Sequence, residues 1–305
     1  APWPEGCILD GEILVWQGES PAGFNALQGR LNRKVVSKKL MLEAPVVFLA
    51  YDLLRFNGIN TVAQNQRQRR TALEDFHAKQ HEASTVNSMP RLLLSQVVCA
   101  ASWQELKLLR EESRARGVEG FMLKHRDSRY GVGRTKADGL WWKWKIDPMT
   151  VDCVLVYAQR GHGRRASLYT DYTFAVWETP PTGAAQAQEV AQAIANGEKV
   201  EDTVARGLPR LVPFAKAYSG LTDEEFKEVD RVIRKHTVDK FGPVRTVVPV
   251  LVFELGFEAI SRSARHKSGV AVRFPRMLRI RHDKPVHEAD HLAVLEALLP
   301  SENVV

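Results

Sequence analysis

Cysteines and long apolar runs are scarce in this sequence. Its three cysteines, Cys7, Cys99 and Cys153, lie far apart and form no CxxC pair. An odd number at such spacing indicates neither a disulfide framework nor a zinc site, and a reducing, cytoplasmic setting is the expectation. No apolar run approaches the roughly 20 residues that cross a bilayer, and no signal peptide opens the chain. We therefore expect a protein with no membrane partner.

An initiator methionine is missing as well. The opening stretch, APWPEGCILDGE, enters an apolar run almost at once, as though the chain had been cut inside a domain. We therefore expect a fragment of a longer protein.

The composition favours an ordinary folded protein with an anionic partner. The 305 residues leave room for two domains, and 44% of them are hydrophobic. The net charge of +7 favours a polyanion such as nucleic acid, without showing where the positive charge gathers.

The stretch from Val118 to Lys145 concentrates polar residues on two short predicted strands. Alternation places Lys143 and Lys145 on one face of WWKWK, about 7 Å apart along the strand, which suits the binding of neighbouring phosphate oxygens. Glu119 at the start of EGFMLK suits a divalent cation beside a polyphosphate. The alternative is an amphipathic strand with a purely structural role.

Two further predicted strands carry candidate residues. ILDGEILVW, Ile8 to Trp16, is interrupted by Asp10, Gly11 and Glu12. This is either an Asp-Gly hairpin turn or a site where Glu12 reaches a sugar hydroxyl or a metal. VVFLAYDLL reads as a buried strand in which Phe48 belongs to the core or covers a flat ring.

The remaining pattern predicts an α+β protein in two domains. Residues 1–147 form the first domain, with a surface helix in 61–80 whose Arg67, Arg69 and Arg70 form a solvated or phosphate-binding face. Residues 148–305 contain short strands around basic loops, which suits an OB-fold β-barrel. Its other predicted features are an insertion at 180–206, a helix from the Thr222/Glu225 capping box to Gly242 and Pro243, a strand over 247–257 and a C-terminal helix over 288–299.

The last informative segment is AVRFPRMLRIRHDK, Ala271 to Lys284. Alternation groups Arg273, Arg279 and Arg281 on one side, which suits bidentate recognition of phosphate. A basic edge strand that resists aggregation is the competing interpretation.

Taken in order, these stretches resemble the ATP-dependent DNA ligases, which are covalent nucleotidyltransferases. LDGEI, VFLAYDLL, VEGFMLK, WWKWK and RFPRMLRIRHDK are similar to five of the family's motifs, and VPFAKAYSGLTDEEF resembles the bacterial enzymes. The resemblance implies that AMP passes from a lysine to the 5′-phosphate of a nick and is then displaced by the 3′-hydroxyl. It implies ATP and Mg²⁺ as cofactors, nicked double-stranded DNA as substrate, and a monomer in the bacterial cytoplasm with partners in DNA repair.

The resemblance also implies roles for single residues. Glu12 contacts the ribose or the metal, Phe48 stacks on adenine, and Glu119 binds the metal. Lys143 and Lys145 contact the AMP phosphate. Arg281, Asp283 and Lys284 act on ATP when the OB domain closes over it. Arg134 lies where the family often has a basic residue before the fifth motif.

One family motif is missing from its expected place. The nucleophilic lysine belongs to KxDGxR upstream of LDGE, and this chain has no such stretch there. Lys136 to Gly139 spells K-x-D-G, but Trp141 stands where arginine is required, so an Asp-Gly turn is the better interpretation. Three alternatives stay open: an RNA ligase, a capping guanylyltransferase, and a noncatalytic OB module that binds nucleic acid.

Overall fold

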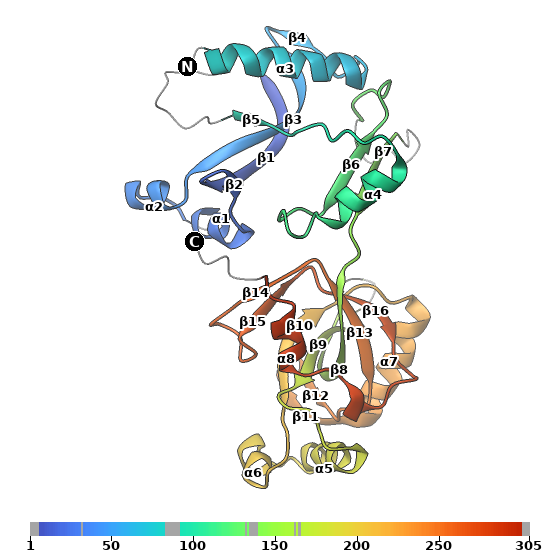
Figure 1. Ribbon diagram of the computed structural model, residues 1–305. Helices are drawn as coiled ribbons and strands as arrows, with labels where there is room; N and C mark the ends of the chain where they lie inside the picture. Colours follow the sequence, from blue (N-terminus) through green and yellow to red (C-terminus); the bar gives the residue numbers. More distant parts are fainter. Residues whose placement is uncertain are drawn as a thin grey trace. The chain divides into compact units, whose positions relative to one another are not determined.

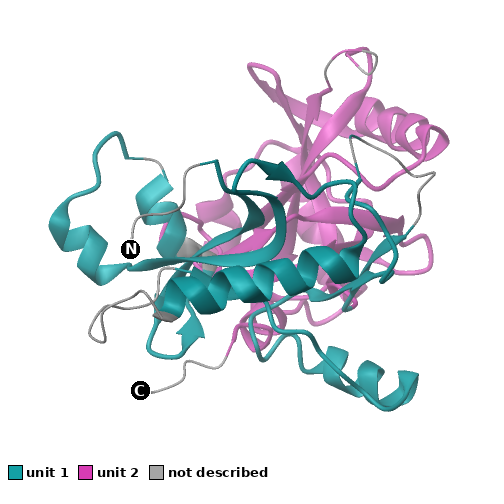
Figure 2. Ribbon diagram, turned by 90° about the horizontal axis from the view of Figure 1, so that it is seen from above, with its two compact units in different colours: residues 1–146 teal, residues 147–305 magenta. Residues whose placement is uncertain are grey.

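The computed structural model describes residues 6–31, 33–82, 92–131, 133, 140–161, 163 and 166–300. Arg134 and the Lys136 to Gly139 stretch lie outside these residues. The chain divides into two compact units, residues 1–146 and 147–305, which are coloured separately in Figure 2. Within the described residues, no helix has the length and apolar character needed to cross a membrane.

The centre of unit 1 is a sheet in the order β2-β1-β3-β4, with β5 added in parallel to β3 (Figure 1). Its long strands confirm the predicted ILDGEILVW and VVFLAYDLL strands, and the Asp-Gly dipeptide lies inside β1 rather than in a hairpin turn. The bounds are β1 Ile8–Gln17, β2 Ser20–Pro21, β3 Val46–Phe56, β4 Ile59–Asn60 and β5 Leu92–Leu94.

A bulge in β3 decides which side chains share a face of this sheet. Gly11 pairs with Ala50 and Asp10 pairs with Asp52, so Tyr51 is the extra residue on β3. A bulge of this kind interrupts the strict alternation of side chains. Tyr51 and Asp52 consequently face the same way although they are neighbours in sequence.

The helices of unit 1 follow the apolar and capping signals of the sequence. In α3, Leu73 and Phe76 are buried and pack with Leu53 beneath the sheet. Ser102 accepts a hydrogen bond from the Glu105 backbone and begins α4. The bounds are α1 Phe24–Leu31, α2 Lys38–Glu43, α3 Gln66–Glu82 and α4 Trp103–Glu111.

A separate hairpin completes unit 1. It joins β6, Gly120–Lys124, to β7, Trp141–Lys145, in antiparallel register. Alternation puts Lys143 and Lys145 on one face, as the sequence predicted, and the pairing adds Met122 and Lys124 to that face. On the other face Trp144 packs edge-on against Trp103 of α4.

Unit 2 is built on a seven-stranded, mainly antiparallel sheet whose inner face carries the largest apolar core. The chain is α+β, as predicted. The hydrogen-bonded ladders of the described strands do not close into the predicted barrel; a single bond from the Met277 amide to the Ser219 carbonyl links β16 to the end of β10. The strands are β8 Met149–Arg160, β9 Tyr169–Trp177, β10 Leu211–Ala217, β11 Thr237–Phe241, β12 Val244–Val247, β13 Val252–Phe257 and β16 Arg276–Ile280, with the separate hairpin β14 Ala259–Arg262 and β15 Val270–Arg273.

Two local predictions for unit 2 were wrong in detail. The segment 180–206, which was predicted as an insertion, contains α5 and α6, and Ala187, Val190 and Ala193 of α5 are buried at helical spacing. The capping box of α7 is present, but α7 ends at His236, and Gly242 instead turns β11 into β12. The predicted 247–257 strand is split between β12 and β13. The helices are α5 Ala184–Ala195, α6 Val200–Ala205, α7 Asp223–His236, η2 Val286–Glu288 and α8 Leu292–Ala297.

Candidate active site

One face of the β1–β3 sheet collects the polar residues of both strands. Glu12 pairs with Leu49, so alternation puts Tyr51 on the face of Glu12, and the bulge adds Asp52, the partner of Asp10, to the same face. The Tyr51 hydroxyl hydrogen-bonds to the Glu12 carboxylate, and burial, reinforced by the charge of Glu12, raises the pKa of Tyr51. Tyr51 therefore stays protonated and keeps its ring beside Glu12.

Phe48 lies on the opposite face. A Cβ on Gly11 would collide with the Phe48 ring, which therefore covers the glycine on the side where α3 packs. Glu12 is the next residue along β1, and alternation turns it away from that side. The structure thus does not bring Phe48 and Glu12 together, whereas it does bring Tyr51 and Glu12 together.

A fully buried ion pair supports this polar face. The Arg69 guanidinium donates to both carboxylate oxygens of Asp52, at 2.9 and 3.1 Å, and both side chains are 0% exposed. Arg69 also donates to Gln66 and to the Ser128 carbonyl. The interpretation of Arg69 as part of a solvated face was wrong, because a carboxylate from the sheet draws this arginine inward.

Lys124 connects the β6–β7 hairpin to the same face. Its ammonium lies 3.8 Å from Asp52 and 4.0 Å from the centre of the Trp141 ring. Burial lowers the pKa of Lys124, and the carboxylates of Asp52 and Asp10 oppose that shift. The polar face of the hairpin therefore adjoins the polar face of the sheet at this lysine.

Tyr130 makes the second link within unit 1. Its hydroxyl donates to Asp10 at 3.1 Å, and its ring packs edge-on against Trp141. Burial, together with the charge of Asp10, raises the pKa of Tyr130 to about 12. These contacts fix the position of Asp10 relative to Trp141 and Lys124.

Glu119 and the two lysines of β7 lie at the other end of the hairpin. The Lys145 ammonium is 2.9 Å from the Glu119 carboxylate. Gly120 between them has a φ of +126°, and a Cβ there would collide with the Trp144 carbonyl, so only glycine fits. Lys143 stands two residues before Lys145 on the same face. The arrangement offers two ammonium groups and one carboxylate to a phosphorylated ligand.

Unit 2 gathers its candidate residues around a carboxylate from β8. The Arg281 guanidinium donates to both oxygens of Asp152, at 2.9 and 2.8 Å, and the Lys284 ammonium lies 2.6 Å from Asp152. Arg281 also donates to Asp283 and lowers the pKa of that carboxyl to about 2. Arg281, Asp283 and Lys284 are thus brought together.

The other two arginines of the predicted row do not join this group. Arg279 pairs with Glu254 at 2.6 Å, and Arg273 belongs to a different strand, β15. A register shift in β16 also separates Met277 from Arg279, so the simple alternation that grouped the arginines does not hold.

Several contributors to the unit 1 site were missed from the sequence. Tyr51, Asp52, Lys124 and Tyr130 received no role there, although an acidic residue inside an otherwise apolar strand was visible at Asp52. Such a residue signals a buried cationic partner. Within the described residues, no group of three or more His, Cys, Asp or Glu side chains has the arrangement of a metal site.

Comparison with known protein families places this site in context. Residues 2–145 match the model of the ATP dependent DNA ligase domain, and residues 202–284 match that of the ATP dependent DNA ligase C terminal region. The chain belongs to the ATP-dependent DNA ligase family. The resemblance seen in the five sequence motifs is confirmed.

Curated ligases from bacteria and archaea are similar along almost the whole chain. A probable DNA ligase of Koribacter versatilis is 36% identical over 97% of this chain and 48% of its own length. DNA ligase 2 of Methanosarcina mazei is 31% identical over 94% of this chain and 45% of its own length. This ligase chain spans about half the length of these relatives.

Solved structures share the fold at lower sequence identity. The structure titled "Pmar-Lig_Pre." has a TM-score of 0.60 at 19% identity and covers 90% of this chain and 51% of its own. A Lig E DNA ligase described as binding DNA with a minimal scaffold has a TM-score of 0.53, also at 19% identity, and covers 90% of this chain and 76% of its own. Both show that the ligase fold extends through the two units.

Proposed function

We propose that this chain forms the part of a bacterial ATP-dependent DNA ligase that holds AMP and helps to seal nicked duplex DNA. The observation that supports this most strongly is the junction of two polar faces in unit 1. It is made by Lys124 at Asp52 and by Tyr130 at Asp10. Through this junction, the face that carries Glu12 of β1 and Tyr51 of β3 adjoins the face that carries the lysines of β7.

Each of these groups has a proposed role toward the nucleotide. Glu12 accepts a hydrogen bond from a ribose hydroxyl, and Tyr51, which lies beside it, stacks on the adenine. We assign the stacking role to Tyr51 instead of Phe48, because the Phe48 ring is turned to the opposite face and covers Gly11. Lys143 and Lys145 bind the phosphate of AMP. Arg134 stays a candidate phosphate ligand from the sequence alone.

Mg²⁺ fits this site as an ion held mainly by substrate. Mg²⁺ commonly takes one or two protein carboxylates and completes its shell with water and phosphate oxygens. Glu119 is the proposed carboxylate, with Glu12 as a second candidate, so a cluster of three ligands is not required. When bound, the ion neutralises negative charge on the phosphoryl oxygens.

The reaction consists of three phosphoryl transfers. A lysine nitrogen attacks the α-phosphorus of ATP and pyrophosphate leaves; the 5′-phosphate of the nick then takes the AMP and frees the lysine. Finally the 3′-hydroxyl attacks that 5′-phosphate, loses its proton and releases AMP. Cations stabilise the charge that builds on phosphoryl oxygens in each step. Arg281 and Lys284, held by Asp152 and with Asp283 beside Arg281, are proposed to act on the pyrophosphate.

The proposed nucleotide site is tested by measuring AMP binding calorimetrically. Removing a stacking ring costs ~1–3 kcal/mol, so Tyr51→Ala is expected to weaken AMP binding about tenfold. Phe48→Leu, which keeps an apolar side chain against Gly11, is expected to leave the affinity unchanged. Loss of affinity in Phe48→Leu with normal binding in Tyr51→Ala would return the stacking role to Phe48.

The interpretation that Lys136 is not the nucleophilic lysine is tested by measuring the intact mass of the chain after incubation with ATP and Mg²⁺. We expect no AMP adduct, because the only K-x-D-G in the sequence, at Lys136, lacks the arginine of the family motif. An adduct that disappears in Lys136→Ala would identify Lys136 as the nucleophile and overturn this assignment. A GMP adduct formed when GTP replaces ATP in the same assay would indicate a capping enzyme instead of a ligase.

A further inference from the structure

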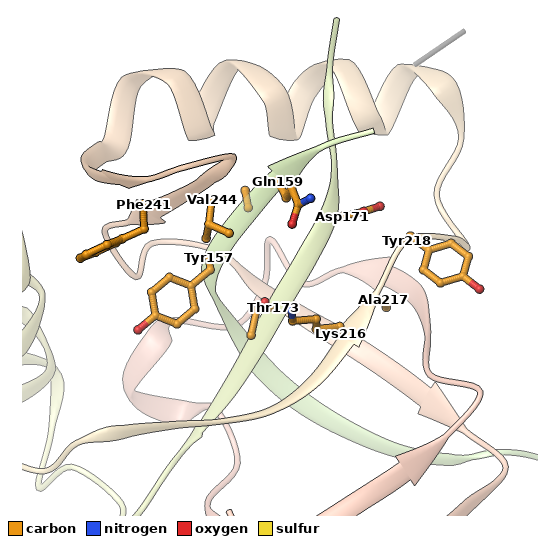
Figure 3. A pocket seen from close by; sticks show the side chains of 10 residues that line it. Tyr157, Gln159, Asp171, Thr173, Lys216, Ala217, Tyr218, Phe241 and Val244 are labelled. Carbon is orange, nitrogen blue, oxygen red and sulfur yellow. The ribbon is translucent and has the colours of Figure 1, made fainter. Parts of the chain in front are cut away.

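The outer face of the unit 2 sheet carries a hollow of about 540 Å³ that has no role in the chemistry above. Its volume is within the usual range for small-molecule sites. Figure 3 shows Tyr157 on one side of it and Tyr218 on the other, with Thr173 and Lys216 between them. We call it the aromatic platform. Its main residues are Tyr157, Tyr218, Phe241, Gln159, Asp171, Thr173 and Lys216.

Strand register explains why these side chains share one face. Thr173 of β9 lies between two partners, Tyr157 of β8 and Lys216 of β10. The residues that alternate with them, such as Ala158, Tyr172 and Ala217, are buried in the core beneath. The platform is therefore the solvent face of a sheet whose opposite face is firmly packed.

The platform exposes two large aromatic side chains to solvent. Tyr218 is 70% exposed and Phe241 is 68% exposed. Aromatic side chains on an exposed protein surface are groups on which successive unpaired bases stack. The rings thus present flat faces that a planar ligand can cover.

The polar groups of the platform select among planar ligands. Gln159 and Asp171 face each other across β8 and β9 in register, and the Asp171 carboxylate accepts hydrogen bonds but donates none. A carboxylate repels phosphate but accepts from an exocyclic amino group such as N4 of cytosine. Lys216 supplies a positive charge for the phosphate that flanks the base.

We infer that the aromatic platform binds an unpaired nucleobase of single-stranded DNA, with preference for bases that carry an exocyclic amino group. A paired base inside a duplex is stacked on both faces and offers no ring surface to Tyr218 or Phe241. The ligand is therefore a frayed or displaced nucleotide near a nick. This inference rests on the proposed function, because it takes nicked DNA as the source of the base.

The test compares two short fluorescein-labelled oligomers by fluorescence anisotropy, using the full 305-residue chain. One is a deoxycytidine oligomer, and the other is an abasic oligomer of the same length, which keeps the phosphates but has no bases. We expect the chain to bind the deoxycytidine oligomer about tenfold more tightly, since each stacked base contributes on that scale. Thymidine oligomers, which lack an exocyclic amino group, are expected to bind more weakly than deoxycytidine oligomers.

Three variants then locate the binding site. Tyr218→Ala is expected to remove most of the difference between the two oligomers, and Tyr218→Phe, which keeps the ring, to preserve it. Lys216→Gln is expected to weaken both oligomers alike. Lys227→Gln is its matched control, because this exposed lysine lies on α7 outside the platform. Thermal melting of Tyr218→Ala at the temperature of the parent chain would establish that the variant is folded.

Two failures are distinguishable. A chain that binds neither the oligomers nor a nicked duplex would contradict the proposed function together with the inference. A chain that binds the nicked duplex but treats deoxycytidine and abasic oligomers alike would overturn the inference alone. The inference would also be overturned if Tyr218→Ala still bound the deoxycytidine oligomer more tightly than the abasic oligomer. Binding of a proline-rich peptide to the platform, with no binding of DNA, would overturn it as well.

Discussion

The two units stabilise their polar sites in different ways. In unit 1 the apolar core is small, and the site depends on a fully buried ion pair, Asp52 with Arg69. In unit 2 the apolar core is extensive, and the ion cluster around Asp152 lies at its surface, with Arg281 17% exposed. A buried ion pair is costly to form but more costly to break on one side. Unit 1 should thus be sensitive to polar substitutions and unit 2 to apolar ones.

The largest expected effect is at Arg69. Arg69→Ala leaves Asp52 buried without its guanidinium, and breaking such a pair on one side costs ~3–5 kcal/mol. Faster hydrogen exchange in peptides from β3 and α3 is the measurement. Arg116→Ala is the matched control, because this arginine is 61% exposed and its pair with Glu112 is worth less than about 1 kcal/mol. Equal effects of the two substitutions would contradict the claim that unit 1 depends on its buried ion pair.

The next effect is in the core of unit 2. Leu255 is 0% exposed in the middle of β13, so Leu255→Ala should cost ~2–5 kcal/mol through lost burial and a cavity. The matched control is Leu278→Ala in the neighbouring strand, because Leu278 is 36% exposed. Denaturant unfolding of unit 2 distinguishes them. A control as destabilising as Leu255→Ala would mean that burial does not set the stability of this sheet.

A smaller effect is expected at the beginning of α7. The Thr222 hydroxyl accepts from the Glu225 amide, and the Glu225 carboxylate accepts from the Thr222 amide. Thr222→Ala should lower the unfolding free energy by ~1 kcal/mol, and Thr222→Ser should restore it because serine caps equally well. Thermal melting of the two variants provides the comparison. Failure of serine to restore stability would show that the hydroxyl is not what matters.

The smallest effect concerns the exposed end of the unit 2 cluster. Arg281 holds the pKa of Asp283 at about 2, below its ordinary 3.8. A lowered carboxyl pKa stabilises the fold above the ordinary value, and this stabilisation is lost as pH falls from 3.8 to about 2. In Arg281→Ala the carboxyl should titrate near its ordinary value, as followed by NMR of the Asp283 side chain. An unchanged titration would remove Arg281 as the cause.

Sequence patterns predicted which helices and strands form better than they predicted where those elements end. Alternation in ILDGEILVW, VVFLAYDLL and WWKWK predicted three strands, and the Thr222/Glu225 capping box predicted the beginning of α7. These signals are local. The ends of α7 and the split between β12 and β13 depend on tertiary contacts, so Gly242 was assigned to the wrong element.

The candidate site shows the same limit more clearly. The face that holds Lys143 and Lys145 followed from alternation, but the bulge at Tyr51 reverses the face of the residues beyond it, and bulges are set by pairing with another strand. Phe48 was chosen as the stacking residue from the family resemblance, whereas the pairing of Glu12 with Leu49 puts Tyr51 on the face of Glu12. The burial of Arg69 was equally invisible, because its partner Asp52 is 17 residues away in the sequence.

The most direct test of the proposed function is sealing of a nicked duplex that already carries AMP on its 5′-phosphate. This step needs no lysyl-AMP, and the roles proposed for Glu119, Lys143 and Lys145 make these residues necessary for it. We expect this chain to seal the nick, and Glu119→Ala and Lys145→Ala to reduce the rate at least tenfold. Lys39→Ala, at a lysine that is 84% exposed, is expected to seal normally. Tight binding of the adenylylated nick with no sealing above background in any variant would contradict the catalytic role proposed here.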